Sequence, residues 1–152
     1  METEAELAFV IHALEEDPRV VSLTPILNGT PLSQMVASFE RTKGFEPVGG
    51  YTGIVPENFR FGPLEAYFMG QSNDPLFSEG VYLLGCTCGE VGCWPLRGRI
   101  SKRGEVMVWD RFHQPHRPER DYSEFGPFSF ELGAYDRAVR DAVARLQSRL
   151  LT

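Results

Sequence analysis

The stretch from residue 80 to residue 113 constrains the fold of this chain more than any other part of the sequence. It contains three runs rich in aliphatic, β-branched and aromatic residues, which read VYLLGCTC (81–88), CWPLRGRIS (93–101) and EVMVWDRF (105–112). The segments between these runs are short and contain glycine, and connections of this kind join antiparallel strands. We therefore expect a three-stranded antiparallel meander over residues 80–113.

A second hairpin is expected near the N-terminus. Residues 5–14 fit either a strand or a helix, because their apolar side chains satisfy both periodicities. The β-rich core FVI, the turn-like EEDPR and the following run VVSLTPIL (20–27) together favour a hairpin. Pro25 would then lie at an edge or a bulge, because it has no N–H to donate to a neighbouring strand.

Residues 31–43 are expected to form an amphipathic helix. Thr30 is a residue type that caps helix N-termini, and Pro31 suits the first helical position. Gly44 can end the helix in the left-handed conformation. The helix would place one apolar face on the core.

Residues 133–150 are expected to form a second helix. Its apolar residues recur every three or four positions, and its polar face carries two i,i+4 ion pairs, Asp136–Arg140 and Asp141–Arg145. The expected fold class is therefore α+β. An antiparallel sheet, made of the N-terminal hairpin and the meander, would be covered by helices at about 31–43 and 133–150.

Residues 44–80 are rich in glycine, proline and aromatic residues, which indicates a long loop with a short helix beginning at Pro63. Loops of this length are often functional or mobile. The alternative, which we favour, is an irregular segment packed by its own aromatic side chains.

The 152 residues, 42% of them hydrophobic, suit a single domain over 1–152 that buries its core without a disulfide or a metal. A net charge of −6 disfavours binding to nucleic acid. No apolar run approaches the ~20 residues of a membrane span. LAFVIHAL also lacks the positive flank of a signal peptide, so we expect a cytoplasmic protein in which a disulfide framework is not favoured.

The only cysteines of the chain are Cys86, Cys88 and Cys93. Because side chains alternate along a strand, Cys86 and Cys88 would point to the same face. A four-residue GEVG loop would place Cys88 directly opposite Cys93. All three sulfur atoms would then share one side of the hairpin.

The next turn is expected to extend this row. A three-residue KRG turn, with Gly104 left-handed, is a common hairpin connection. The register that it sets would give the pairs Ile100–Val106, Trp94–Phe112, Arg97–Trp109 and Cys93–His113. A histidine would thus lie beside the third cysteine, and His116 would be close enough to reach the same place.

Three interpretations of the cysteines remain open. Three thiolates and one imidazole suit a tetrahedral zinc site, which is usually structural when all four ligands come from the protein. Alternatively, Cys88 and Cys93 would form a reversible disulfide, with Cys86 available for exchange. Alternatively, all three are small buried apolar residues, as free cysteines often are.

Other chemistry-bearing motifs are weak. The sequence contains neither a phosphate-binding GxxxxGK[ST] loop nor a GxSxG nucleophile elbow. Asp110 is interpreted as the partner of a neighbouring arginine, and His12 as a structural histidine. Arginines concentrate between residues 97 and 120 and would suit an anionic ligand or an acidic partner, but interspersed acidic residues favour a mixed, solvated face.

Several blocks of the sequence resemble a family of small bacterial proteins of unknown function that is frequent in genomes of high G+C content. These blocks are LLGCTCGEVGCWPL, VWDRFHQPHRP, FGPFSFELGAYDRAV, LNGTPLSQMV and GGYTGI. The resemblance covers roughly residues 20–145 and implies no catalytic role. It implies one ligand set for any metal, Cys86, Cys88, Cys93 and His116, because that family commonly has another residue at the position of His113.

The sequence thus favours a small cytoplasmic, non-catalytic binding or interaction module with a cysteine-rich hairpin. Zinc is the candidate cofactor. The expected partner is a protein, a small molecule or a second copy of the chain, rather than nucleic acid or a membrane. The rival hypothesis is a thiol-redox or metal-assisted enzyme that uses Cys88 and Cys93.

Overall fold

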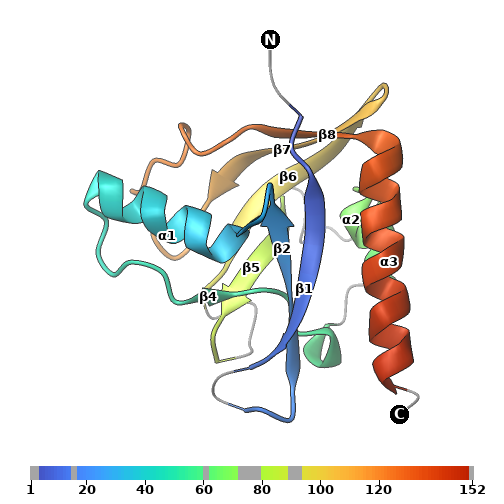
Figure 1. Cartoon of the computed structure of the whole chain (residues 1–152). Coiled ribbons are helices and arrows are strands. Elements are labelled where there is room, and N and C mark those ends of the chain that lie inside the picture. Colours follow the sequence, from blue (N-terminus) through green and yellow to red (C-terminus); the bar gives the residue numbers. More distant parts are fainter. Residues whose placement is uncertain (1–3, 15–16, 60–61, 72–79, 89–93, 151–152) are drawn as a thin grey trace.

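The computed structural model describes residues 4–14, 17–59, 62–71, 80–88 and 94–150, and Figure 1 shows how its elements are arranged. The helices are α1 (Leu32–Lys43), α2 (Leu64–Phe68) and α3 (Leu132–Leu150), and a 3-10 turn, η1, covers Pro56–Asn58. The strands are β1 (Leu7–Ala13), β2 (Val21–Leu27), β3 (Thr30–Pro31), β4 (Tyr51–Thr52), β5 (Val81–Cys86), β6 (Leu96–Arg103), β7 (Val106–His113) and β8 (Phe128–Glu131). The α+β class is confirmed, with the strands divided between two antiparallel sheets of order β1-β2-β3 and β4-β5-β6-β7-β8.

The expected N-terminal hairpin and the helix after it are both present. In β1 and β2, Leu7 lies opposite Leu27 in an antiparallel register. The helix α1 begins one residue later than expected, because Thr30 pairs with Leu27 as part of β3 and Pro31 becomes the N-cap. Gly44 ends α1 in the left-handed conformation, with a φ of 74°, as its sequence position predicts.

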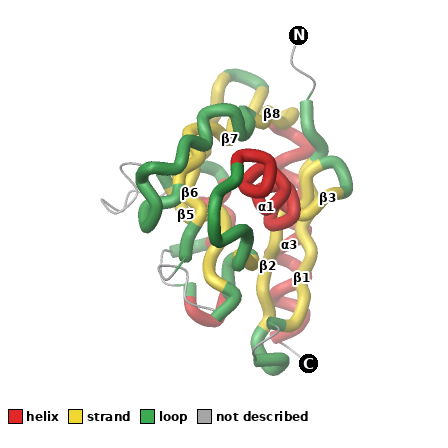
Figure 2. The backbone as a smooth tube through the Cα atoms, turned by 90° about the vertical axis from the view of Figure 1, so that its left-hand side faces the viewer, coloured by secondary structure: helices red, strands yellow, loops and turns green. Residues whose placement is uncertain are grey.

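The C-terminal helix α3 runs beside β1 (Figure 1). Its buried side chains include Tyr135, Val139, Ala142 and Leu146. Both expected ion pairs are present on its exposed face, Asp136–Arg140 at 2.9 Å and Asp141–Arg145 at 3.0 Å. Figures 1 and 2 agree that α1 and α3 lie on opposite sides of the strands, so the two helices cover different sides of the core.

Two contacts join the sheets into a ring of neighbouring strands. At one seam, the Leu23 N–H donates to the Ile54 carbonyl at 2.7 Å, and the Ile54 N–H donates back at 3.1 Å. At the other seam, the Ala5 N–H donates to the carbonyl of Ser129 in β8 at 2.7 Å. A Cβ on Gly53 would lie only 1.9 Å from the Leu23 carbonyl oxygen, so the first seam requires glycine at this position.

The described part of residues 44–80 is packed against the core. The short helix α2 follows Pro63, as expected, and contributes the buried side chains of Tyr67 and Phe68. Phe59 meets Tyr67 edge to face at 4.9 Å, and Phe68 meets Phe9 of β1 at 5.1 Å. Within the described ranges, no helix is both long enough and apolar enough to cross a membrane.

Candidate functional site

The first two cysteines lie where β5 ends. The strand stops at Cys86, two residues earlier than expected, so Cys88 lies in a turn and is exposed. Cys86 is half-buried and pairs with Tyr51 of β4. The N–H of Cys88 donates to the Cys86 Sγ at 3.2 Å. Cys93 lies outside the described residues, and so does its expected pairing with Cys88.

The meander is present, but the expected register between β6 and β7 is wrong. Arg103 pairs with Val106, so the connection is a two-residue turn rather than a three-residue one. Gly104 occupies its first central position with a φ of 64°, and tight hairpin turns favour glycine there. As a result, Ile100 lies opposite Trp109 and not opposite Val106.

A second shift in the register follows at Arg111. Its φ of 55° is unusual for a residue with a side chain, and the ladder is irregular at this point, as at a β-bulge. Beyond the bulge, His113 pairs with Arg97, so the expected pairs Cys93–His113 and Arg97–Trp109 are both wrong. The guanidinium of Arg97 instead lies 5.1 Å from the ring centre of Tyr82.

After β7, the chain turns back through Gln114 and His116. The Gln114 side-chain carbonyl accepts the His116 N–H at 2.8 Å, and its main-chain carbonyl accepts the Arg117 N–H at 2.9 Å. The His116 side chain is exposed, whereas Gln114 is only 1% exposed. Gln114 Oε1 accepts the His116 N–H, so the other atom of the amide is the donor nitrogen Nε2. This buried donor has no hydrogen-bond partner in the part of the chain that the structure describes.

Trp94 joins the cysteine segment to the turn that carries His116. Its indole N–H donates to the Gly49 carbonyl at 2.9 Å, and its ring stacks on Tyr51 at 6.3 Å. The guanidiniums of Arg117 and Arg120 lie 5.2 Å and 5.7 Å from the same indole. The residue after Cys93 therefore contacts the residue after His116.

The chemistry of the donor set fits zinc, since thiolate and imidazole are the ligands that zinc prefers. The structure brings Cys86 and Cys88 together through the N–H···S hydrogen bond. Within the described ranges, however, no three His, Cys, Asp or Glu side chains are gathered as a ligand group.

Gly49, which accepts the Trp94 indole N–H, is also bonded to a fully buried carboxylate, that of Glu40 in α1. Its Oε1 accepts the Gly49 N–H at 2.8 Å. Its Oε2 accepts the hydroxyls of Tyr51 at 2.7 Å and Tyr122 at 2.6 Å, and Arg120 Nη1 at 3.1 Å. We call Glu40, Tyr51, Arg120 and Tyr122 the Glu40 network. It ties α1 to β4 and to the connection after β7.

This network was not expected from the sequence, although a clue was present. Leu32, Val36 and Glu40 lie four residues apart along α1, so the carboxylate falls on the buried face of the helix. A charged residue in that position needs a partner, because an unpaired buried charge is costly. The partner, Arg120, is 80 residues away in the chain and could not be identified by spacing.

Burial raises the pKa of four tyrosines and so disfavours the loss of their phenolic protons. It raises the pKa of Tyr51 and Tyr122, and their hydrogen bonds to Glu40 raise it further. Burial also raises the pKa of Tyr67 and of Tyr135 above the ordinary value of 10.0. The contribution of these raised pKa values to the free energy of unfolding is therefore complete below pH 10. It is lost as the pH rises above 10, because the unfolded chain releases these protons at a lower pH than the folded chain does.

An ultraviolet titration of phenolate formation should therefore show most of the 5 tyrosines ionising only when the chain unfolds at alkaline pH. Circular dichroism, followed over the same pH range, locates the unfolding transition. Smooth ionisation of all the tyrosines near pH 10 in a chain that remains folded would contradict these pKa directions.

Two other sequence-based interpretations are confirmed as structural. Asp110 lies opposite Arg99 in the sheet and accepts hydrogen bonds from Arg99 at 2.8 and 2.9 Å and from Arg103 at 3.2 Å. His12 Nε2 is hydrogen-bonded to Thr24 Oγ1 at 2.9 Å, beside the seam between the sheets.

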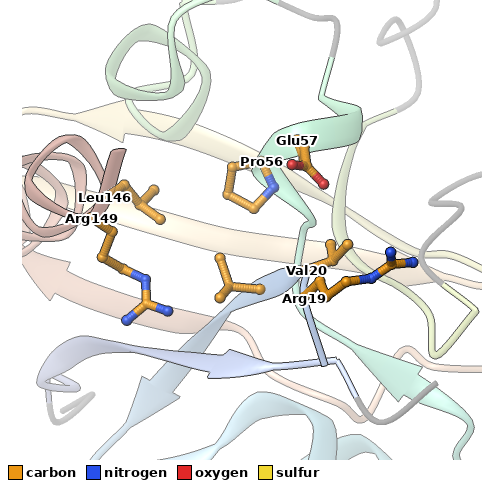
Figure 3. A pocket seen from close by; sticks show the side chains of 7 residues that line it. Arg19, Val20, Pro56, Glu57, Leu146 and Arg149 are labelled. Atoms are coloured by element: carbon orange, nitrogen blue, oxygen red, sulfur yellow. The ribbon is translucent and has the colours of Figure 1, made fainter. Parts of the chain in front are cut away.

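A separate cavity of about 300 Å³ lies between the turn after β1, η1 and the last turns of α3 (Figure 3). Apolar side chains and three charged ones line it: Arg19, Val20, Val21, Pro56, Glu57, Leu146 and Arg149. Arg19 is paired with Asp17 at 3.1 Å. The cavity is lined by charges of both signs, which favour no single class of ligand.

No protein-family model, curated protein or solved structure matches this chain.

Proposed function

We propose that this chain is a small non-catalytic binding module whose cysteine-bearing segment is stabilised by zinc, with Cys86, Cys88, Cys93 and His116 as ligands. The contact that carries the proposal is Trp94 against Arg117. It holds the chain next to Cys93 against the chain next to His116. When bound, zinc would supply a tetrahedral cross-link between these two segments.

Two hydrogen-bonding features support this ligand set. The Cys88 N–H donates to the Cys86 sulfur, a contact that stabilises a thiolate. The buried Gln114 Nε2, two residues before His116, is a donor in need of an acceptor, and an unsatisfied buried donor costs about 1–3 kcal/mol. A zinc-bound thiolate would provide such an acceptor.

The surroundings of two enclosed carboxylates favour a module without catalysis. Glu40 is saturated by hydroxyl, amide and guanidinium donors, and Asp110 is paired with two arginines. Both carboxylates therefore hold elements together.

The proposal is tested by the zinc content of protein purified without chelators or metal-affinity tags, with thiols counted after denaturation. We expect about one zinc per chain and three thiols, because the metal protects the cysteines from oxidation. Cys93→Ser and His116→Ala should lose the metal.

His113→Ala is the matched control and should keep the zinc, since His113 pairs with Arg97 and lies outside the proposed ligand set. A chain without zinc and with three thiols would refute the proposal. A chain without zinc and with one thiol would refute it in favour of a redox role for a disulfide between two of the cysteines.

A further inference from the structure

We infer that Cys86 and Cys88 are a dithiol pair that closes reversibly to a disulfide by exchange with a small disulfide such as glutathione disulfide. Both residues carry thiols in the structure. This role goes beyond the proposed function and does not rest on it, because every step concerns the chain without a metal. The pair also differs from the disulfide between Cys88 and Cys93 that the sequence suggested.

The main chain brings the two cysteines close enough for a disulfide. In an extended strand, the Cα atoms of residues i and i+2 lie roughly 7 Å apart, at the upper limit of the range of about 4.4–6.8 Å that disulfides span. The strand β5 ends at Cys86, however, and Thr87 and Cys88 lie in a turn. A turn shortens this separation, so the early end of β5 favours a bond that a strand continuing to residue 88 would disfavour.

The Cys86 sulfur already lies against the main chain of Cys88. The Cys88 N–H donates to Cys86 Sγ at 3.2 Å. The Cys88 Sγ is joined to the same nitrogen through only Cα and Cβ, so rotation about χ1 can place it on the side where the Cys86 sulfur lies. The two sulfur atoms can therefore meet when one exposed side chain turns.

The chain before Cys88 is held in place. Cys86 pairs with Tyr51 across β4 and β5, and the Thr87 N–H donates to the Gly50 carbonyl at 3.2 Å. Cys86 is half-buried, whereas Cys88 is exposed. Because the main chain up to Thr87 is fixed, closing the bond costs little further conformational entropy, and the effective concentration of one thiol at the other is high.

The exchange proceeds by two substitutions at sulfur. The exposed Cys88 thiolate attacks glutathione disulfide, forms a mixed disulfide with one glutathione and releases the other as its thiolate. The Cys86 thiolate, which the Cys88 N–H stabilises, then attacks the Cys88 sulfur and expels the second glutathione thiolate. The cysteine pair loses two electrons, glutathione disulfide gains them, and the two cysteine protons end on the released thiolates.

The inference is tested with the Cys93→Ser chain, freed of metal by a chelator, in buffers with a rising proportion of glutathione disulfide. Cys86 and Cys88 are the only cysteines of this variant. Alkylation followed by mass spectrometry distinguishes open thiols, glutathione adducts and the internal disulfide. We expect both thiols to disappear together, with the mass of two hydrogen atoms lost and no glutathione bound, and to return when dithiothreitol is added.

The same variant unfolded in urea is the matched control, because it has the same two thiols without the turn. The unfolded chain should need about 10-fold more glutathione disulfide to be half-oxidised, because the ordered geometry raises the effective concentration of the thiols. Cys86→Ser combined with Cys93→Ser keeps only Cys88 and should stop at the glutathione adduct. Circular dichroism checks that each variant is folded without urea.

The wild type provides a second measurement that needs no substitution. After the same treatment, peptide mapping by tandem mass spectrometry should locate the disulfide between Cys86 and Cys88 and find Cys93 as a thiol. A disulfide that includes Cys93 would refute the pairing.

Two other results would also overturn the inference. One is a folded Cys93→Ser chain that keeps both thiols or stops at a glutathione adduct. The other is equal oxidation of the folded and unfolded chains, because the turn would then contribute nothing. Neither result bears on the zinc content of the wild type, so failure of the dithiol pair and failure of the proposed function are distinguishable.

Discussion

Replacing Glu40 by glutamine should lower the free energy of unfolding by about 3–5 kcal/mol, because it leaves the Arg120 guanidinium buried without a counter-charge. The substitution keeps the shape of the side chain, so the loss reports the charge and the acceptor oxygens rather than a cavity. Both side chains are almost completely inaccessible to water, which makes the penalty large. Urea unfolding followed by tryptophan fluorescence measures the change.

Glu124→Gln is the matched control for this prediction. It removes an ion pair of 2.8 Å between Lys43 and Glu124, but the Glu124 side chain is 73% exposed. Exposed pairs contribute about 0–1 kcal/mol, so the control should remain close to the wild type. If Glu40→Gln were equally neutral, the Glu40 network could not be the buried ion pair described above.

Replacing Gly53 by alanine should cost about 3 kcal/mol or more. The new Cβ would lie 1.9 Å from the Leu23 carbonyl oxygen and 2.6 Å from the Thr24 Cα, and these backbone atoms cannot rotate away. The strands must separate, which breaks the two Leu23–Ile54 hydrogen bonds. Each lost bond costs about 1 kcal/mol, and the displaced packing costs about 1–3 kcal/mol more.

Gly133→Ala provides the control for a glycine substitution without such a clash. Gly133 lies in the first turn of α3, and the atom nearest to its added Cβ is the flexible carboxylate end of Glu131 at 3.0 Å. The denaturant midpoint should stay at or above the wild-type value, since alanine favours helix more than glycine. Equal midpoints for Gly53→Ala and wild type would show that the two sheets are not joined as described.

The longer elements could be predicted from the sequence because local periodicity determines them. The apolar stripe and the ion pairs of α3 are repeated every three to four residues, and the N-terminal hairpin follows from two β-rich runs around a turn. The strands β3 and β4 have only two residues each, and a segment this short has no periodic pattern from which it could be predicted. They form because neighbouring strands offer backbone partners.

The register of the meander could not be predicted for a different reason. It depends on the two residues of the Gly104 turn and on the bulge at Arg111, and arginine carries no sequence signature for a left-handed conformation. These two shifts move His113 from the expected position beside Cys93 to a position opposite Arg97. The Glu40 network could not be predicted from the sequence either, because only tertiary contacts bring Arg120 to Glu40.

The ligand set is tested most directly by X-ray absorption at the zinc edge of the zinc-loaded chain. We expect three sulfur ligands at about 2.3 Å and one nitrogen at about 2.0–2.1 Å. The nitrogen should disappear from the first shell in His116→Ala and remain in His113→Ala. A first shell of oxygen and nitrogen alone, or a chain that retains no zinc to measure, would contradict the proposed site.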